Sequence, residues 1–209
     1  MMEYPKIQSI FKRDEKTHKF IEGQFSLPEF EYLKDNIWVY TEKINGTNCR
    51  IEWNPHPLGD EIKFAGRTDN AQLPVFLFDR LQKLFTVGKF RSLYPDVSMT
   101  LYGEGYGARI QKGGGNYIPA GVDCILFDVM IQGWWLKRED AEEIAKKLGI
   151  QVVPIVGERT LQQAIDLIKK GVKSQWGDFL AEGLVLKPKV ELKDRAGRRI
   201  VTKVKHKDF

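Results

Sequence analysis

Hydrophobic and polar residues alternate along residues 48–53, and this period of two predicts a strand with one buried face. Cys49, Ile51 and Trp53 form its apolar face. The opposite, polar face carries Asn48, Arg50 and Glu52. A break containing two prolines follows. Residues 61–65 are therefore expected to return as the partner strand of a hairpin.

Three further segments have apolar residues at helical spacing: residues 75–85, 139–148 and 160–170. Thr160 and Gln163 form a capping box for the third helix, while Gly149 and Gly171 mark the ends of the second and third. Apolar runs predict strands over residues 38–40, 99–102, 124–131, 184–186 and 200–207. Because regular helical crossovers between strands are missing, the pattern favours an α+β fold of mostly antiparallel sheets flanked by helices.

The composition indicates a folded protein of about one domain, since 42% of the 209 residues are hydrophobic and 29% are charged. We expect residues 38–209 to form this domain, with residues 1–37 packed on it. No apolar run approaches the ~20 residues that span a bilayer, and no secretory signal is evident. Cys49 and Cys124 lack the spacing of a zinc site or a disulfide framework. A soluble monomer of the cytoplasm is expected (the host cytoplasm for a viral protein).

Positive charge is concentrated in residues 187–209, although the whole chain has a net charge of only +5. This segment contains nine basic residues against three acidic ones. Such a concentration indicates a phosphate-bearing partner, and a solvated cationic surface is the alternative.

A Lys-x-x-Gly sequence places Lys43 just after a predicted strand, with Gly46 permitting a tight turn. The chain contains four such sequences, starting at Lys43, Lys63, Lys112 and Lys146, so the match alone has little value. An ordered series after Lys43 distinguishes it from the others. The series comprises an arginine after a strand, a glutamate between glycines, an aromatic residue in an apolar strand, a glutamate before a strand, and two lysines that share a face: Arg67, Glu104, Phe127, Glu182, Lys203 and Lys205.

This series resembles the covalent nucleotidyltransferase superfamily of polynucleotide ligases and capping enzymes, over roughly residues 38–207. The amino-acid sequences of residues 42–48 and 182–188 are similar to motifs of the RNA ligase 2 branch. The resemblance implies an adenylyltransferase fold and an ATP-dependent ligase that joins RNA 3′-hydroxyl and 5′-phosphate ends. Such an enzyme passes AMP from a lysine to the RNA 5′ end, with Mg²⁺ or Mn²⁺ as metal ion.

The resemblance also implies residue roles. Lys43 would be the nucleophile, with Lys203, Lys205 and Arg67 contributing to catalysis. Since an ordinary lysine is almost fully protonated at pH 7, neighbouring cations are expected to favour the neutral amine. The nucleotide would be bound by Glu42, Lys43, Arg67, Glu104, Phe127, Glu182, Lys187, Lys203 and Lys205. The metal would be held, through water, by Glu104, Glu182 and Asn45. RNA would contact Asn48, Arg109 and Lys112.

Two departures from the family pattern leave alternatives open. Much of the superfamily has aspartate where this chain has Asn45, so either the branch relies on Glu104 and Glu182 or the position has been substituted. The chain also has no room for the OB domain of DNA ligases and capping enzymes, which indicates a catalytic core alone. A DNA ligase, a GTP-using capping enzyme and a non-catalytic RNA-binding relative remain the alternatives.

Overall fold

The computed structural model describes residues 2–209, and the chain forms two compact units. The first unit contains residues 2–5 and Asn45–Val153, and the second contains Lys6–Ile44 and Pro154–Phe209. Both units therefore combine pieces that are distant in the sequence. None of the three boundaries coincides with the expected division after residue 37, and the grouping into a single domain stays a prediction.

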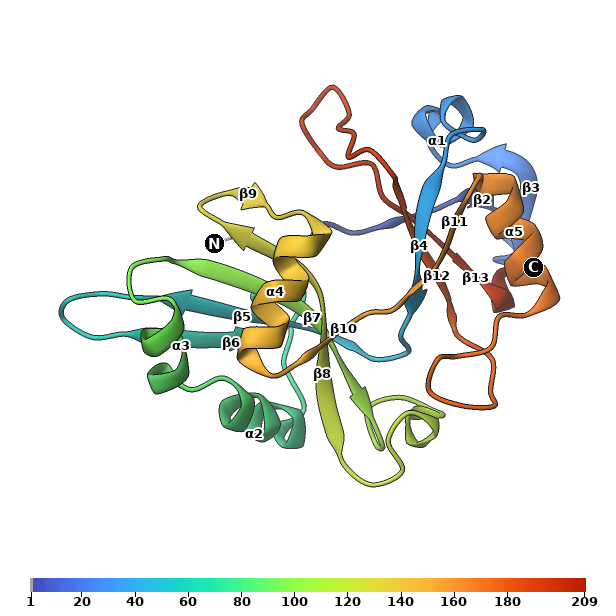
Figure 1. The fold of residues 1–209 in the computed structure, drawn as a ribbon. Helices are drawn as coiled ribbons and strands as arrows, with labels where there is room; N and C mark the ends of the chain where they lie inside the picture. Colours follow the sequence, from blue (N-terminus) through green and yellow to red (C-terminus); the bar gives the residue numbers. More distant parts are fainter. Residues whose placement is uncertain (1) are drawn as a thin grey trace. The chain divides into compact units, whose positions relative to one another are not determined.

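The second unit is built on a five-stranded sheet in the order β1-β13-β12-β4-β11 (Figure 1). The strands are β1 (Gln8–Ser9), β13 (Thr202–Lys205), β12 (Gly183–Pro188), β4 (Trp38–Lys43) and β11 (Ile155–Arg159). All neighbours are antiparallel except β1 and β13. The remaining elements are the hairpin β2 (Phe11–Arg13) and β3 (Phe20–Phe25), with α1 (Pro28–Tyr32), α5 (Leu161–Lys170) and the 3₁₀ helix η2 (His206–Asp208).

Helix α5 covers one face of this sheet and forms its core. Its buried residues pack against alternate residues of the strands, including Trp38, Tyr40, Leu184, Leu186 and Val204. The predicted capping box is present, since the Thr160 hydroxyl accepts from the Gln163 amide and the Gln163 side chain accepts from the Thr160 amide. Because alternate residues point to opposite faces, the residues between these apolar ones lie on the face away from α5.

The first unit has a sheet in the order β10-β8-β7-β5-β6, with β9 paired to β8. Its strands are β10 (Gln151–Val152), β8 (Val122–Ile131), β7 (Met99–Gly107), β5 (Thr47–Asn54), β6 (Glu61–Ala65) and β9 (Trp134–Trp135). Its helices are α2 (Val75–Leu84), α3 (Val87–Leu93), α4 (Arg138–Leu148) and the 3₁₀ helix η1 (Gly114–Asn116). Helices α2 and α4 pack on β8, and the buried side chains between helices and sheet form the core.

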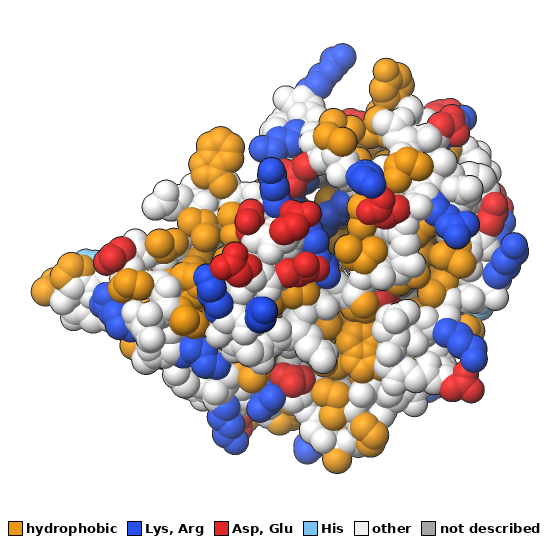
Figure 2. Space-filling model, viewed as in Figure 1, with side chains coloured by type: hydrophobic (Ala, Val, Ile, Leu, Met, Phe, Trp, Pro, Cys, Tyr) orange, Lys and Arg blue, Asp and Glu red, His pale blue; other side chains and the backbone are white. Residues whose placement is uncertain are grey.

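Charge on α4 follows the helix dipole. Acidic side chains gather over the beginning of α4 (Figure 2), where the first turn carries Glu139 and Asp140. Lys146 and Lys147 occupy its last turn, and Gly149 ends the helix in the left-handed conformation at φ 71°. Both arrangements favour the helix, because anions stabilise its positive N-terminus and cations its negative C-terminus. The predicted end of this helix at Gly149 is confirmed, and its start lies one residue before the predicted residue 139.

The α+β class, the antiparallel sheets and the predicted hairpin of β5 and β6 are confirmed. Other expectations were wrong in detail. The polar face of β5 is not open to solvent, since Arg50 and Glu52 are 2% and 5% exposed. In α2, helical spacing of the apolar residues would place Phe78 on the buried face with Leu81, but the buried residues are Leu77 and Leu81, and Phe78 is exposed. No helix among residues 2–209 is long and apolar enough to cross a membrane.

The two cysteines meet in the core of the first unit. Cys49 on β5 and Cys124 on β8 flank Gly103 of the intervening strand β7. Their Sγ atoms lie 3.1 Å apart as free thiols, because Gly103 has no side chain to separate them. The contact with the Cys124 thiol, together with burial, raises the pKa of Cys49. The Cys49 thiol therefore stays neutral, and both buried side chains pack as small apolar groups.

Candidate active site

Strand pairing in the second unit brings Lys43 and Lys205 to the two sides of Gly183. Gly183 of β12 lies directly opposite Lys43 of β4 and, on its other side, opposite Lys205 of β13. Residues directly opposite each other share a face of a sheet. Lys187 and Lys203 share this face as well, since Lys187 pairs with Val39 and Lys203 with Val185. We call this surface, away from α5, the lysine face.

Gly183 is required by the close approach of β13. A side-chain Cβ at this position would lie 2.1 Å from the carbonyl oxygen of Val204 and 2.9 Å from Cα of Lys205. Both contacts are with backbone, which cannot move aside without breaking the ladder. The absence of a side chain here also leaves open the space between Lys43 and Lys205.

The carboxylate of Glu182 lies in this space and binds both lysines. Lys43 Nζ donates to Oε2 and Lys205 Nζ donates to Oε1, each over 2.6 Å. The Glu182 side chain is only 15% exposed. Burial by itself raises the pKa of Glu182, but the charges and hydrogen bonds of Lys43 and Lys205 outweigh this effect, and the pKa lies below its ordinary value. Glu182 is therefore ionised at neutral pH.

Lys203 adds a third ammonium group to the lysine face. Burial lowers the pKa of Lys203, and the charges of Lys205 and Lys43 lower it further. Glu182 opposes this effect, but it already serves the other two lysines. The lysine face therefore carries an excess of positive charge beside Lys43, which suits an anion such as a phosphate.

Glu42 lies behind the lysine face. Its side chain points to the side of α5 and is 1% exposed. It accepts hydrogen bonds from the Ser174 hydroxyl over 2.7 Å and from the Gln175 amide over 2.8 Å. Glu42 thus holds the loop after α5 against β4, and its expected part in nucleotide binding stays a prediction.

In the first unit, Glu104 of β7 lies directly opposite Asn48 of β5, on the sheet face away from α2 and α4. Asn48 Oδ1 is buried and accepts no hydrogen bond from residues 2–209. A Cβ at Gly46 would lie 2.3 Å from the Gly105 carbonyl oxygen and 2.7 Å from Cγ of Glu104. The glycine of the Lys-x-x-Gly sequence is therefore needed for the turn to pass beside Glu104.

Phe127 occupies a β-bulge of β8. Tyr102 pairs with Asp128 and Gly103 pairs with Leu126, so Phe127 is the extra residue between them. A bulge turns a side chain out of its regular direction. Phe127 is half-buried, and its ring contacts Tyr4 edge-on at a centroid distance of 4.9 Å. The Tyr4 hydroxyl donates to Asp128 over 2.6 Å. Sequence reasoning missed Tyr4, which has no local pattern to mark it.

The glycine-rich segment after β7 is joined to the turn after Lys43. Asn45 Nδ2 donates to the Lys112 carbonyl oxygen over 3.2 Å, and the Asn45 amide donates to the Tyr117 hydroxyl over 3.3 Å. Arg109 adopts φ 71° and places its guanidinium 4.9 Å from the centre of the Phe76 ring. The side-chain amide of Asn45 therefore acts as a hydrogen-bond donor, which an ionised aspartate at this position could not do.

Two arginines of this unit, Arg67 and Arg50, have opposite surroundings. Arg67 is exposed just after β6. Arg50 is buried, with its guanidinium 2.9 Å from Glu52 and also paired with Asp69. The alternation in β5 marked Arg50 as polar but could not reveal these acidic partners, since Asp69 follows in a separate loop.

A divalent metal would have to be held indirectly. Residues 2–209 contain no group of three or more His, Cys, Asp or Glu side chains that could hold a metal ion. Both oxygens of Glu182 already accept from lysines. The expected part of Glu104, Glu182 and Asn45 in holding Mg²⁺ or Mn²⁺ stays a prediction, in which water and substrate phosphate would supply most of the ligands of a hard cation.

The antiparallel α+β architecture, with lysines on adjacent strand ends, is a fold of the nucleotidyltransferase type. A family model described as RNA ligase matches residues 36–205. The chain therefore belongs to the RNA ligase family. No curated protein sequence matches the chain at a significant level.

Several solved structures of the Naegleria gruberi RNA ligase share this fold. An apo mutant gives a TM-score of 0.65 at 19% identity and covers 97% of this chain and 56% of that chain. The same ligase with PPi gives 0.64 at 18% identity, with 97% and 61% covered. A mutant with ATP and Mn gives 0.66 at 19% identity, with 99% and 64% covered. This chain thus spans less than two thirds of the length of these structures.

Proposed function

We propose that this chain is the nucleotidyltransferase core of an ATP-dependent RNA ligase that joins RNA 3′-hydroxyl and 5′-phosphate ends. The observation that carries the proposal is the row of Lys43, Glu182 and Lys205, in which a conformationally fixed lysine amine lies beside further cations. Membership in the RNA ligase family and the shared fold of ATP-bound and PPi-bound relatives support it. We expect the protein to act as a monomer in the cytoplasm.

In the first step, Nζ of Lys43 attacks the α-phosphorus of ATP. A phosphorus–nitrogen bond forms, the bond to the β-phosphate oxygen breaks, and pyrophosphate leaves. The ammonium group must first lose a proton, and the Glu182 carboxylate at 2.6 Å is the nearest acceptor. Lys203 and Lys205 stabilise negative charge on the α-phosphate. A divalent metal would supply further charge neutralisation at the phosphates.

In the second step, an RNA 5′-phosphate oxygen attacks the phosphorus of lysine–AMP, and the phosphorus–nitrogen bond breaks. In the third step, the RNA 3′-hydroxyl attacks the 5′-phosphate, and AMP leaves with its electron pair. We assign Lys187 to phosphate binding, Phe127 to adenine stacking, and Glu104 and Arg67 to the ribose. Asn48, with its unpartnered Oδ1, is assigned to the RNA end together with Arg109 and Lys112.

The test separates nucleotide transfer from joining. The protein is incubated with α-labelled ATP and Mg²⁺ or Mn²⁺, and covalent labelling is read on a denaturing gel. RNA with a 5′-phosphate is then added, and the label should pass to the RNA before joined product forms. Labelling by GTP alone would indicate a capping enzyme, and joining of DNA ends alone a DNA ligase. A protein that binds RNA but never forms the adduct would be a non-catalytic relative.

A further inference from the structure

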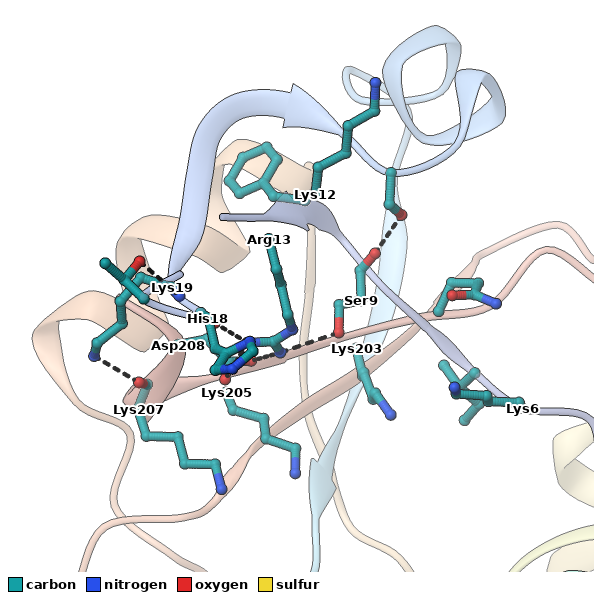
Figure 3. Close-up of a pocket in the computed structure, with 15 residues that line it drawn as sticks. Lys6, Ser9, Lys12, Arg13, His18, Lys19, Lys203, Lys205, Lys207 and Asp208 are labelled. Carbon is teal, nitrogen blue, oxygen red and sulfur yellow. Dashed lines mark hydrogen bonds and ion pairs between the residues drawn. The ribbon is translucent and has the colours of Figure 1, made fainter. Parts of the chain in front are cut away.

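A basic pocket in the second unit lies next to Lys203 and Lys205. It has a volume of about 690 Å³ and is walled by β1, the β2–β3 hairpin, β13 and η2 (Figure 3). Its cationic lining includes Lys6, Lys12, Arg13, Lys19, Lys203 and Lys207. Sequence reasoning did not assign the residues before Trp38 to any site, because their neighbours in the pocket come from the far end of the chain.

The pocket has almost no negative charge to balance these cations. Asp208 is its only acidic lining residue. Its carboxylate accepts two hydrogen bonds from Arg13, over 3.0 and 2.7 Å, and is thereby already neutralised. Lys6 and Lys203 lie close enough for their charges to repel. The pocket is therefore strongly positive and suited to a ligand with more than one negative charge.

The walls of the pocket are fixed by contacts between the hairpin and η2. Arg13 also donates to the His18 carbonyl oxygen over 2.9 Å and to the Ser9 hydroxyl over 3.3 Å. Lys19 Nζ donates to the carbonyl oxygens of Lys207 and Phe209. These two cations are thus used to build the wall. Lys205 is bound by Glu182, and Lys12 points away from the lysines of the C-terminal strand (Figure 3). This leaves Lys6, Lys203 and Lys207 as the ammonium groups available to a ligand.

Three lysines of the C-terminal strand and η2 extend in the same direction. Figure 3 shows the side chains of Lys203, Lys205 and Lys207 side by side, with their ammonium groups on one side of the backbone. Lys205 is bound by Glu182, and Glu182 also binds Lys43. The row therefore leads from the proposed nucleophile along the pocket towards Lys207.

The lining is mainly polar and cationic, and it exposes no Phe, Tyr or Trp ring for stacking. Its neutral residues include Gln8, Ser9, Thr17 and Ser26, Phe11 is only 4% exposed, and the one other ring is the imidazole of His18. Base recognition in single strands needs exposed aromatic rings, while phosphate contacts need cations and hydroxyl groups. The lining thus fits a phosphate backbone of any base sequence.

We propose that this pocket binds the phosphodiester backbone of the RNA strand whose end is being joined, through Lys6 and Lys207. The inference rests on the proposed ligase function and adds a subsite formed by the N-terminal segment. It gives the strand a path away from Lys43 that is independent of base sequence.

The test compares two double variants with the same change in net charge. Lys6→Ala/Lys207→Ala removes the two ammonium groups that the proposal assigns to the RNA backbone and keeps Lys203, which is assigned to the α-phosphate. Lys34→Ala/Lys170→Ala is the matched control, because both lysines are exposed in the same unit and lie outside the pocket lining. Affinity for a fluorescent single-stranded RNA with a 5′-phosphate is measured by anisotropy at several salt concentrations, and lysine–AMP formation is measured separately.

The pocket variant should bind RNA about tenfold more weakly at low salt, and its slope of log affinity against log salt should be shallower by about 1.4, or ~0.7 for each lost contact. The control should match the parent, and lysine–AMP formation should be unchanged in both. An equal loss of RNA affinity in the two double variants would overturn the proposal. Slower lysine–AMP formation with unchanged RNA affinity in the pocket variant would also overturn it and would assign the pocket to ATP. RNA affinity requires no ligation, so a parent without adduct formation would refute the proposed function alone.

Discussion

The ammonium group of Lys43 lies 2.6 Å from Oε2 of Glu182, although 139 residues separate them in the sequence. Sheet register produces this contact, since Gly183, directly after Glu182, pairs with Lys43 on one side and Lys205 on the other. The carboxylate therefore holds two like charges near each other that would otherwise repel. A lysine with a fixed position and a proton acceptor in contact is what nucleophilic attack requires.

Lys43→Ala should abolish covalent labelling by α-labelled ATP, because the other amine opposite Gly183, that of Lys205, lies on the neighbouring strand β13 and is bound to Glu182. The fold should persist, since the side chain lies on the sheet face away from α5. The gel assay for the adduct and a thermal unfolding curve check both statements.

Lys63→Ala is the matched control for this variant, because Lys63 also begins a Lys-x-x-Gly sequence. Its side chain is exposed on β6 and pairs with Glu61 over 3.3 Å. It should label like the parent. A Lys43→Ala protein that labels equally well would exclude Lys43 as the nucleophile.

Glu182→Gln should reduce the rate of lysine–AMP formation by roughly tenfold or more, since the amide neither accepts a proton nor balances two ammonium groups. It should also destabilise the fold at pH 7 by roughly 1.5–3 kcal/mol, the usual contribution of hydrogen bonds to charged groups. Single-turnover kinetics and urea unfolding measure the two effects.

The stability difference between the parent and Glu182→Gln should depend on pH. The folded-state pKa of Glu182 lies below its ordinary value of 4.5, because Lys43 and Lys205 outweigh its burial. Its stabilising effect is therefore fully present above pH 4.5 and is lost as the pH falls through the folded-state pKa. Urea unfolding of both proteins from pH 7 to pH 3 should show the gap closing only below 4.5. A gap that is constant across this range would contradict the assignment.

Lys203→Met should make the protein more stable and less active. Burial and the charges of Lys205 and Lys43 lower the pKa of Lys203, so the charged side chain destabilises the folded state throughout neutral pH. Methionine keeps most of the volume without the charge. The midpoint of thermal unfolding should rise, while lysine–AMP formation should fall by roughly tenfold or more as α-phosphate stabilisation is lost. A fall in both quantities would mean that Lys203 acts mainly in packing.

Gly183→Ala should separate β12 from β13, because its Cβ would lie 2.1 Å from the Val204 carbonyl oxygen. We expect a loss of about 1–3 kcal/mol in unfolding free energy and a strong loss of adduct formation. Gly157→Ala is the control, since Gly157 lies in β11 of the same sheet with nothing within 4 Å of an added Cβ. Denaturant unfolding of the two variants measures the difference, and equal stabilities would show that the sheet can accommodate a side chain at Gly183.

Local patterns in the sequence were sufficient for the elements and for part of the site. The capping box at Thr160, the end of α4 at Gly149 and the strand that begins at Trp38 all depend on residues within a few positions of each other. That strand extends to Lys43, which was expected just after it. The shared face of Lys203 and Lys205 follows from their spacing alone. The wider series of site residues came from a resemblance to a family, and their individual roles stay predictions.

The sequence by itself thus determined the fold class, the main strands and helices, and the candidate lysines. Only the tertiary structure decided that Glu182 joins Lys43 to Lys205, that Arg50 is buried beside Asp69, that Tyr4 contacts Phe127, and that residues 6–19 wall a basic pocket with η2. The physical reason is the range of the interactions. Hydrophobic periodicity and capping act within a turn or a strand, whereas each of these contacts depends on which distant strands and loops pair, and local propensity does not encode that choice.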